Sequence, residues 1–302
     1  MSKISIVGVP MDLGADRRGV DMGPSALRYA DLNEHLVELG HDVEDLGDLD
    51  VIIPETQHYG DPQAKYLQEI TDACIQLANI TLSIYEKDRT PLVLGGDHSI
   101  AVGTLSGMAE GFRRRHLNLG LLWFDAHADM NTPQTSPSGN VHGMPMASVL
   151  GYGPPELVNI FGFSPKLPRD RVVMIGLREV DREERELVKK SGIRVFTMKE
   201  IDRRGIGSVM DEALGIVTRG TDGFSVTLDA DFLDPYDSPG VATPVRGGAS
   251  YREAHLAMEM IADTRKMASF EITEINPILD VHNKTAQFGM ELILSAFGKQ
   301  IL

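Results

Sequence analysis

Three short segments of this 302-residue chain carry side chains that can bind a metal ion. The first follows Leu92–Leu94, the second follows Leu119–Phe124, and the third follows Phe224–Leu228. In two of them the candidate residues are two positions apart, and residues with that spacing point to one face of an extended chain. Each segment can therefore present its ligands from one side of a strand end. The candidates are His98, Asp125, His127, Asp129, Asp229 and Asp231.

Four carboxylates and two imidazoles form an oxygen-rich ligand set. Such a set suits Mn²⁺, whereas Zn²⁺ sites usually use more His or Cys. Six side chains cannot all bind one ion comfortably, but two ions about 3.5–4 Å apart and bridged by carboxylates accommodate them and make a hydrolytic site. The four carboxylates also balance two divalent ions, so a cationic substrate would be tolerated. The sequence therefore predicts two Mn²⁺ ions per chain.

Each of these residues also has a structural interpretation. An Asp at a strand end usually serves a turn or a cap, and a lone His is more often packed and hydrogen-bonded than ligated. Three such segments, each directly after an apolar strand, favour a metal site over three unrelated caps. The remaining histidines lack this context, and we expect them at the surface or in packing contacts. They are His35, His41, His58, His116, His255 and His282.

The elements that must position these segments are alternating strands and helices. Apolar runs bounded by Gly, Pro or Asp predict buried strands, and amphipathic stretches between them predict helices. This alternation indicates an α/β fold with a doubly wound parallel sheet, in which ligands bind beyond the carboxyl ends of the strands. The predicted strands are Ile4–Val9, Leu92–Leu94, Leu119–Phe124, Val172–Ile175, Arg194–Phe196, Phe224–Leu228 and Phe270–Ile275. The predicted helices are Pro24–Leu39, Lys65–Lys87, Tyr251–Ala262 and Asn283–Phe297.

Composition limits the remaining possibilities. The net charge of −15 argues against a nucleic-acid partner. No apolar run approaches the roughly 20 residues of a membrane span, so no membrane partner is expected. The single cysteine, Cys74, excludes a disulfide within the chain and favours the cytoplasm. Loops are expected at Val51–Asp61 and Asn131–His142, and because no linker stands out we predict a single domain over residues 1–302.

The three metal segments match, in order and spacing, the signatures of the ureohydrolase family, and the chain resembles the arginases within it. The similarity runs from about Ile4 to the C-terminus. It includes the segments Leu94–Ser99, Trp123–Pro133, Ser138–Pro145, Ile175–Asp181 with Glu184, Thr227–Asp231, Thr243–Pro244, Tyr251–Glu253 and Glu274–Pro277. The resemblance implies an eight-stranded parallel sheet in a single domain, a homo-oligomer (trimer or hexamer), and Mn²⁺-dependent hydrolysis of L-arginine to L-ornithine and urea.

The resemblance also assigns roles at the site. One Mn²⁺ would take His98, Asp125, Asp129 and Asp229, and the other would take Asp125, His127, Asp229 and Asp231, so that Asp125 and Asp229 bridge. Asp129, His142 and Glu274 are the expected catalytic residues. Glu274 would pair with the guanidinium, Asp129 would carry a proton to the leaving nitrogen, and His142 would act as acid or proton shuttle. The expected substrate-binding residues are Asn131, Ser138, Asn140, Asp181, Glu184, Thr243 and Glu274.

One position departs from the family pattern. Phe232 stands where the family commonly has Gly after the last metal Asp. If that position required a positive φ, a bulky residue there would be strained. The effect on the loop from Phe232 to Asp237 is therefore a point for the structure to decide.

Three other interpretations stay open at this stage. An agmatinase or another guanidino-acid ureohydrolase would share the metal site without the need to hold an α-amino acid. A deacetylase of the histone-deacetylase type would use one Zn²⁺ and fewer Asp ligands. A catalytically inactive, arginine-binding oligomer would usually have lost a metal ligand, and all six are present here.

Overall fold

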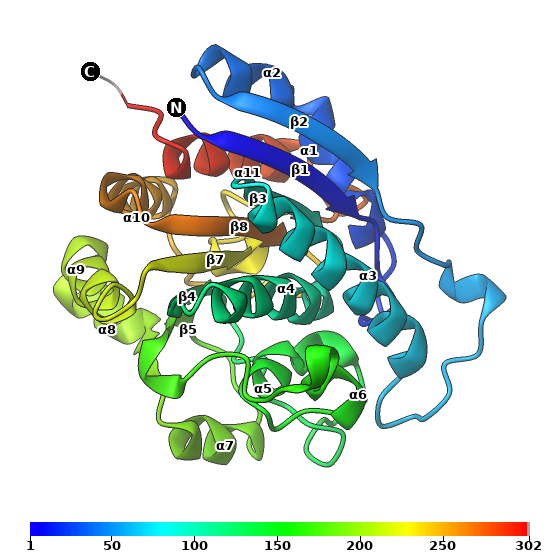
Figure 1. Cartoon of the computed structure of the whole chain (residues 1–302). Coiled ribbons are helices and arrows are strands. Elements are labelled where there is room, and N and C mark those ends of the chain that lie inside the picture. Colours follow the sequence, from blue (N-terminus) through cyan, green and yellow to red (C-terminus); the bar gives the residue numbers. More distant parts are fainter. Residues whose placement is uncertain (301–302) are drawn as a thin grey trace.

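One parallel sheet organises the computed structural model, which describes residues 1–300 (Figure 1). Its eight strands lie in the order β2-β1-β3-β8-β7-β4-β5-β6, and every strand pairing is parallel. The α/β class and the eight-stranded sheet are thereby confirmed. The strands are β1 (Lys3–Val9), β2 (Asp42–Asp48), β3 (Thr90–Gly95), β4 (Leu119–Phe124), β5 (Val172–Leu177), β6 (Arg194–Thr197), β7 (Gly223–Asp229) and β8 (Met267–Thr273).

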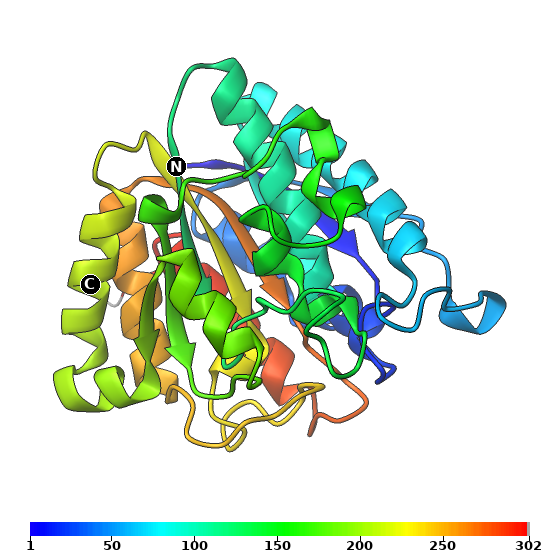
Figure 2. The same cartoon turned by 90° about the horizontal axis from the view of Figure 1, so that it is seen from below.

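Helices cover both faces of the sheet (Figure 2). Alternate strand residues divide the core between the faces, because successive side chains of a strand point to opposite sides. Leu122 and Phe124 pack with α1, α2 and α8 to α11, whereas Leu121 and Trp123 pack with α4 and α5. The helices are α1 (Gly23–Tyr29), α2 (Leu32–Glu38), α3 (Leu67–Glu86), α4 (Ala101–Arg114), α5 (Pro145–Val149), α6 (Pro155–Val158), α7 (Glu184–Ser191), α8 (Met198–Arg204), α9 (Ile206–Val217), α10 (Tyr251–Thr264) and α11 (Lys284–Ala296).

Two predicted elements needed correction, and one strand was not predicted. The sequence interpretation missed strand β2, an edge strand paired only with β1, because most of its residues are polar or glycine and give no apolar run. The helix predicted from Pro24 to Leu39 is two helices, separated at Asp31, whose φ of 58° is left-handed. Strand β8 ends at Thr273 and not at Ile275, since Glu274 has a φ of 64° and leaves the sheet.

The strand order gathers the chemistry at one edge. The three metal segments follow β3, β4 and β7, and β8 lies between β3 and β7. The carboxyl ends of these neighbouring strands meet at the same edge of a parallel sheet. Residues 301 and 302 of the predicted domain lie outside the described residues, and within residues 1–300 no helix is long and apolar enough to cross a membrane.

Candidate metal centre and substrate cleft

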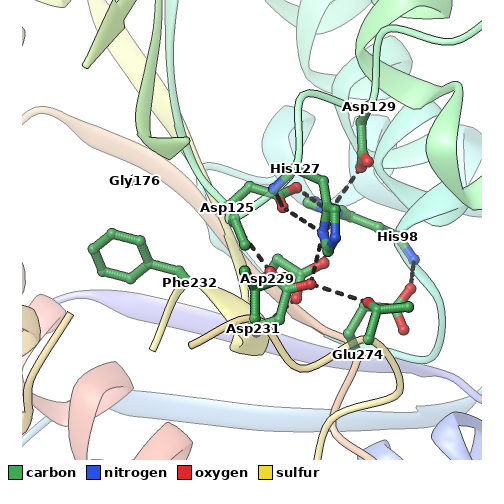
Figure 3. Close-up of polar contacts among 12 residues, drawn as sticks. His98, Asp125, His127, Asp129, Gly176, Asp229, Asp231, Phe232 and Glu274 are labelled. Atoms are coloured by element: carbon green, nitrogen blue, oxygen red, sulfur yellow. Dashed lines mark hydrogen bonds and ion pairs between the residues drawn. The ribbon is translucent and has the colours of Figure 1, made fainter. Parts of the chain in front are cut away.

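His98 is the centre of one group of ligands (Figure 3). Its Nδ1 lies 3.2 Å from a carboxylate oxygen of each of Asp125, Asp129 and Asp229. His98 opens the short 3-10 helix η3 (His98–Ile100) after β3, and its side chain is buried. Four side chains from three separate segments therefore converge on one point beneath the surface.

A second group shares Asp125 with the first. The Nδ1 of His127 lies 2.9 Å from Asp231 Oδ2 and 3.6 Å from Asp125 Oδ1. In each of the two sets, His98–Asp125–Asp229 and Asp125–His127–Asp231, the ligand atoms lie within 4.8 Å of one another. The two oxygens of Asp125 thus face different histidines. The structure brings together all six side chains that the sequence predicted as ligands.

The site fits cations because it contains buried polar atoms that no protein group satisfies. His98 Nδ1, Asp129 Oδ2 and Glu274 Oε2 are buried and make no hydrogen bond. An unsatisfied buried polar atom costs free energy, and a cluster of three needs an external partner. Imidazole nitrogen and carboxylate oxygens are together suitable ligands for a divalent ion such as Mn²⁺.

The electrostatics of these residues lead to the same conclusion. Burial, reinforced by repulsion from Asp125, raises the pKa of Asp129 to about 7. Burial and the neighbouring carboxylates also hold the pKa of Asp229 well above its usual value. Burial acts to lower the pKa of His98, but the surrounding carboxylates outweigh it and raise the pKa well above the ordinary value. Without metal ions, bound protons therefore neutralise the negative charge of these buried carboxylates. Bound cations can neutralise the same charge.

Asp125 and Asp229 each stabilise a turn and also direct an oxygen toward the candidate metal site. Asp125 Oδ1 accepts the backbone N–H of His127 at 2.6 Å, and Asp229 Oδ1 accepts that of Asp231 at 2.7 Å. These side chain to backbone bonds over two residues shape the turn after each strand. In both residues Oδ2 remains directed toward His98. The structural and functional interpretations of these aspartates are therefore compatible.

Two site residues have a backbone conformation that is unusual for residues other than glycine. Asp129 has a φ of 51° and Glu274 a φ of 64°. Such conformations cost roughly 1–3 kcal/mol and persist where surrounding structure enforces them. The backbone N–H of Glu274 donates to Gly96 O at 2.8 Å, and the carbonyl of Asp129 accepts from Ala147 N at 3.1 Å. These bonds hold both side chains at the end of the sheet.

A cleft opens above the metal centre, and its lining contains most of the predicted substrate residues. Asn131 and Asp181 come from different loops and are joined by a hydrogen bond of 2.9 Å from Asn131 Nδ2 to Asp181 Oδ2. Ser138 and Asp181 are solvent-exposed, whereas Asp129 and Asp229 are buried. The cleft thus leads from an exposed polar rim to the metal ligands. Its predicted lining residues are Asn131, Ser138, Asn140, Asp181, Glu184 and Thr243.

Glu184, Asn140 and Thr243 also have protein partners. Both carboxylate oxygens of Glu184 accept backbone N–H groups, from Met130 and from Asp181, and burial raises its pKa to about 7. Asn140 Oδ1 accepts from Lys65 Nζ at 3.1 Å. The Thr243 hydroxyl donates to Asp231 Oδ2 at 3.1 Å. Glu184 and Thr243 therefore hold the cleft and the metal ligands in place.

Glu274 and His142 are in contact beside the metal ligands. Glu274 Oε1 accepts the backbone N–H of His98 at 2.9 Å and lies 3.1 Å from His142 Nδ1. Burial lowers the pKa of His142, but the adjacent Glu274 carboxylate prevails and raises it to about 9. This pKa favours the imidazolium form of His142 at neutral pH. The second carboxylate oxygen of Glu274, Oε2, makes no hydrogen bond to the protein.

The strain considered for Phe232 does not occur. Phe232 lies in the 3-10 helix η7 (Ala230–Phe232) and does not have a positive φ. Its ring is fully buried, packs edge-on against Phe124 at 5.3 Å, and occupies the space beside Gly176 (Figure 3). Gly176 has a φ of 105°, and a Cβ there would lie 2.3 Å from Phe232 Cδ2. The bulky residue is accommodated because its neighbour is a glycine.

Sequence analysis missed several residues of the site. Ser136 and Glu179 also line the cleft. The Arg178 guanidinium donates to the carbonyls of Asp231 at 2.6 Å and Val245 at 2.8 Å, and so fixes the loop after β7. Arg178 and Glu179 lie within the motif Ile175–Asp181, but their spacing in the sequence did not identify them as site residues.

The remaining histidines behave as predicted. None of them lines the cleft or belongs to either ligand group. His58, His116 and His282 are exposed, and His35 and His41 are partly buried. His255 is buried and lies 2.9 Å from Ser295 Oγ.

The fold and the site define a hydrolase built on a doubly wound parallel sheet, with side chains grouped for metal ions at its carboxyl edge. The arginase family model matches residues 2–298, and the chain belongs to that family. It is 53% identical to the arginase of Brevibacillus brevis over 99% of both chains. The native arginase structure from Bacillus caldovelox superposes with a TM-score of 0.95 at 50% identity, over the whole of both chains. An agmatine ureohydrolase from Thermoplasma volcanium, at 22% identity and a TM-score of 0.74 over 98% of this chain and 88% of its own, shares the fold.

Proposed function

We propose that this protein is an arginase that hydrolyses L-arginine to L-ornithine and urea with two Mn²⁺ ions. The observation that carries the proposal is the composition of one cleft. Ser138 and Asp181 lie at its exposed rim, Asn131 is buried below them and bonded to Asp181, and Asp129 and Asp229 lie at its buried end beside the half-buried His127. The rim groups suit the carboxylate and ammonium of an amino acid, and the buried end suits metal ions. High identity to proteins named arginase supports the same conclusion.

The six ligands would be divided so that Asp125 and Asp229 contact both ions. The two carboxylate oxygens of Asp125, each facing a different histidine, support its bridging role. Bound Mn²⁺ would lower the pKa of a water molecule and so supply the nucleophile that hydrolysis of a guanidinium needs at neutral pH. That attack needs activation because resonance makes the guanidinium a poor electrophile.

The chain's own residues orient the substrate and move protons. Glu274 Oε2, buried and without a protein partner, is suited to accept the fork of guanidinium donors. Asp129 would carry the proton to the leaving nitrogen. His142 would donate or relay a proton, because beside Glu274 it is protonated at neutral pH. Asn131 and Ser138 would bind the substrate carboxylate, and Asp181 its ammonium.

Three substrates distinguish recognition of the substrate carboxylate from recognition of the substrate ammonium. L-arginine has both end groups, agmatine lacks the carboxylate, and 5-guanidinopentanoate lacks the ammonium. Each charge-assisted hydrogen bond contributes roughly 1.5–3 kcal/mol, so loss of two or three should reduce kcat/KM about 10³-fold or more. We therefore expect strong preference for L-arginine. Comparable kcat/KM for agmatine would assign the protein to agmatinase-like chemistry.

The variant Asp181→Ala tests the ammonium site. It should lower kcat/KM for L-arginine and agmatine by roughly 10–100-fold, the effect of one charge-assisted bond, and leave 5-guanidinopentanoate unchanged. Asp181→Asn is the matched control, since it keeps an acceptor for Asn131 Nδ2 but removes the charge. Mn²⁺ content should be the same in all three proteins. A loss that is equal for all three substrates would contradict this assignment.

Assembly and location are further parts of the proposal. We propose a homo-oligomer, trimer or hexamer, with Arg252 at its interface, working in the cytoplasm as the single cysteine suggests. In the isolated chain Arg252 is largely exposed and pairs with Glu259 of its own helix at 3.2 Å. That pair is accessible to a second subunit. Sedimentation showing a monomer at micromolar concentration would exclude the oligomer.

A further inference from the structure

Strands β7 and β8 carry polar side chains inside the sheet, below the metal centre. Ser225 stands opposite Ser269 and Thr227 stands opposite Glu271, all of them at most 1% exposed. Ser269 Oγ donates to Ser225 Oγ at 2.8 Å, and Thr227 Oγ1 donates to Glu271 Oε1 at 2.7 Å. Buried parallel strands are usually apolar, so the fully buried carboxylate of Glu271 requires a specific reason.

The upper of these two pairs reaches a metal ligand. His98 Nε2 lies 2.9 Å from Thr227 Oγ1, and the other oxygen of Glu271 accepts the hydroxyl of Thr104 on α4. The chain of contacts therefore runs from His98 through Thr227 to Glu271 and ends at Thr104. The lower pair, Ser225 and Ser269, makes no side-chain hydrogen bond to any of the six ligands.

The position of the proton on the His98 ring sets the direction of these hydrogen bonds. Nδ1 of His98 faces Asp125, Asp129 and Asp229, so it must keep its lone pair free to bind a cation. The ring proton then resides on Nε2, which donates to Thr227 Oγ1. Thr227 has one proton of its own, and Glu271 accepts it. His98 Nε2 therefore donates to Thr227 Oγ1, and Thr227 Oγ1 donates to Glu271 Oε1.

We propose that Thr227 and Glu271 are positioning residues that hold His98 in the tautomer and orientation needed to bind one of the two metal ions. Resting on the proposed metal centre, the inference concerns residues that never touch substrate. Partners of this kind orient the ligand ring and raise its basicity, and their loss typically reduces metal affinity 10–100-fold. His127 lies in the other ligand group, so the second ion is unaffected.

The test measures binding of Mn²⁺ to the whole protein, without an activity assay. Free Mn²⁺ is followed by electron paramagnetic resonance as metal-free protein is titrated, which resolves the two binding events. Thr227→Val removes the hydroxyl at nearly constant shape, and Thr227→Ser restores it. Ser225→Ala is the matched control, because it removes a buried hydrogen bond from the same strand without reaching His98.

We expect Thr227→Val to weaken one Mn²⁺ by roughly 10–100-fold and leave the other unchanged, with Thr227→Ser and Ser225→Ala close to wild type. Glu271→Gln provides a second test if Thr227→Val folds poorly, since the amide oxygen still accepts from Thr227, although the charge and the acceptor for Thr104 are lost. It should weaken the same ion by a smaller factor.

The outcomes separate this inference from the proposed function. Wild-type protein that binds fewer than two Mn²⁺ ions would overturn the metal centre and the positioning role together. Two ions in the wild type with unchanged affinity in Thr227→Val and Glu271→Gln would overturn the positioning role alone. An equal loss in Ser225→Ala would also overturn it, because the effect would then come from any buried polar pair of β7 and β8.

Discussion

The contact between Gly176 and Phe232 gives a prediction specific to this chain. The buried ring of Phe232 fills the space beside Gly176. In Gly176→Ala the new methyl would lie 2.3 Å from Cδ2 and 2.6 Å from Cε2 of that ring, and 3.0 Å from Asp125 O. The backbone is also at a φ of 105°, which L side chains rarely adopt. Two separate costs therefore act on the same substitution.

The magnitude follows from these two costs. Overpacking a well-packed core costs about 1–3 kcal/mol, and holding a residue other than glycine at an unfavourable positive φ costs about 1–3 kcal/mol. Gly176→Ala should thus lower the free energy of unfolding by about 2–6 kcal/mol, a large part of the 5–15 kcal/mol typical of a folded protein. Because Phe232 follows Asp231 directly, the second metal group should also bind Mn²⁺ less well.

A double-mutant cycle separates the two costs. Urea unfolding is measured on metal-free protein, so that metal binding does not contribute to stability. Phe232→Val removes both ring atoms that the methyl meets, and in that background Gly176→Ala should be less costly by about 1–3 kcal/mol. Gly40→Ala is the matched control for the backbone term, since Gly40 has a φ of 85° and a Cβ there would meet nothing within 4 Å.

Two results would refute this reasoning. If Gly176→Ala destabilises no more than Gly40→Ala, the ring does not occupy the space that the structure gives it. If Gly176→Ala costs the same with Phe232 and with Val at that position, the two residues are not coupled. Either result would mean that the packing of Phe232 against Gly176 does not determine the cost of the substitution.

Three further predictions concern the site. Asp229→Ala should leave fewer than two Mn²⁺ ions by metal analysis and abolish urea release, and retained activity would contradict the binuclear mechanism. His142→Ala should lower kcat about 10²-fold with unchanged Mn²⁺ content, so full kcat from pH 7 to 10 would exclude a proton-transfer role. In metal-free protein, an NMR titration of His142 should give a pKa of about 9. Its pairing with Glu274 should therefore stabilise the fold fully below pH 6.5 and lose that effect as the pH rises through about 9. Glu274→Gln should bring the pKa back toward 6.5, and an unchanged value would show that Glu274 does not cause the shift.

The sequence predicted much of the fold because buried parallel strands leave a strong local signal. Strands β1, β3, β4, β5 and β7 were found from continuous apolar runs. Strand β2 was not, because its residues at the sheet edge are polar and its place depends on backbone pairing with β1. The break at Asp31 and the end of β8 at Glu274 were missed for a related reason, since a single left-handed residue has no periodic signature.

The sequence by itself identified the six candidate metal ligands, because residues two apart on a strand end must face one way and because ligand chemistry depends on residue type. Only the tertiary structure decided which groups those ligands form. Asp125 Oδ2 lies beside His98 because the segments after β4 and β3 converge at the carboxyl edge of the sheet, although β7 and β8 separate these two strands. Only the structure showed that Glu184 accepts the backbone N–H of Met130 and that Gly176 makes room for Phe232. It likewise revealed that Glu271 reaches His98 through Thr227. Each of these contacts joins residues distant in sequence, and their separation is set by strand order and packing, which local spacing does not encode.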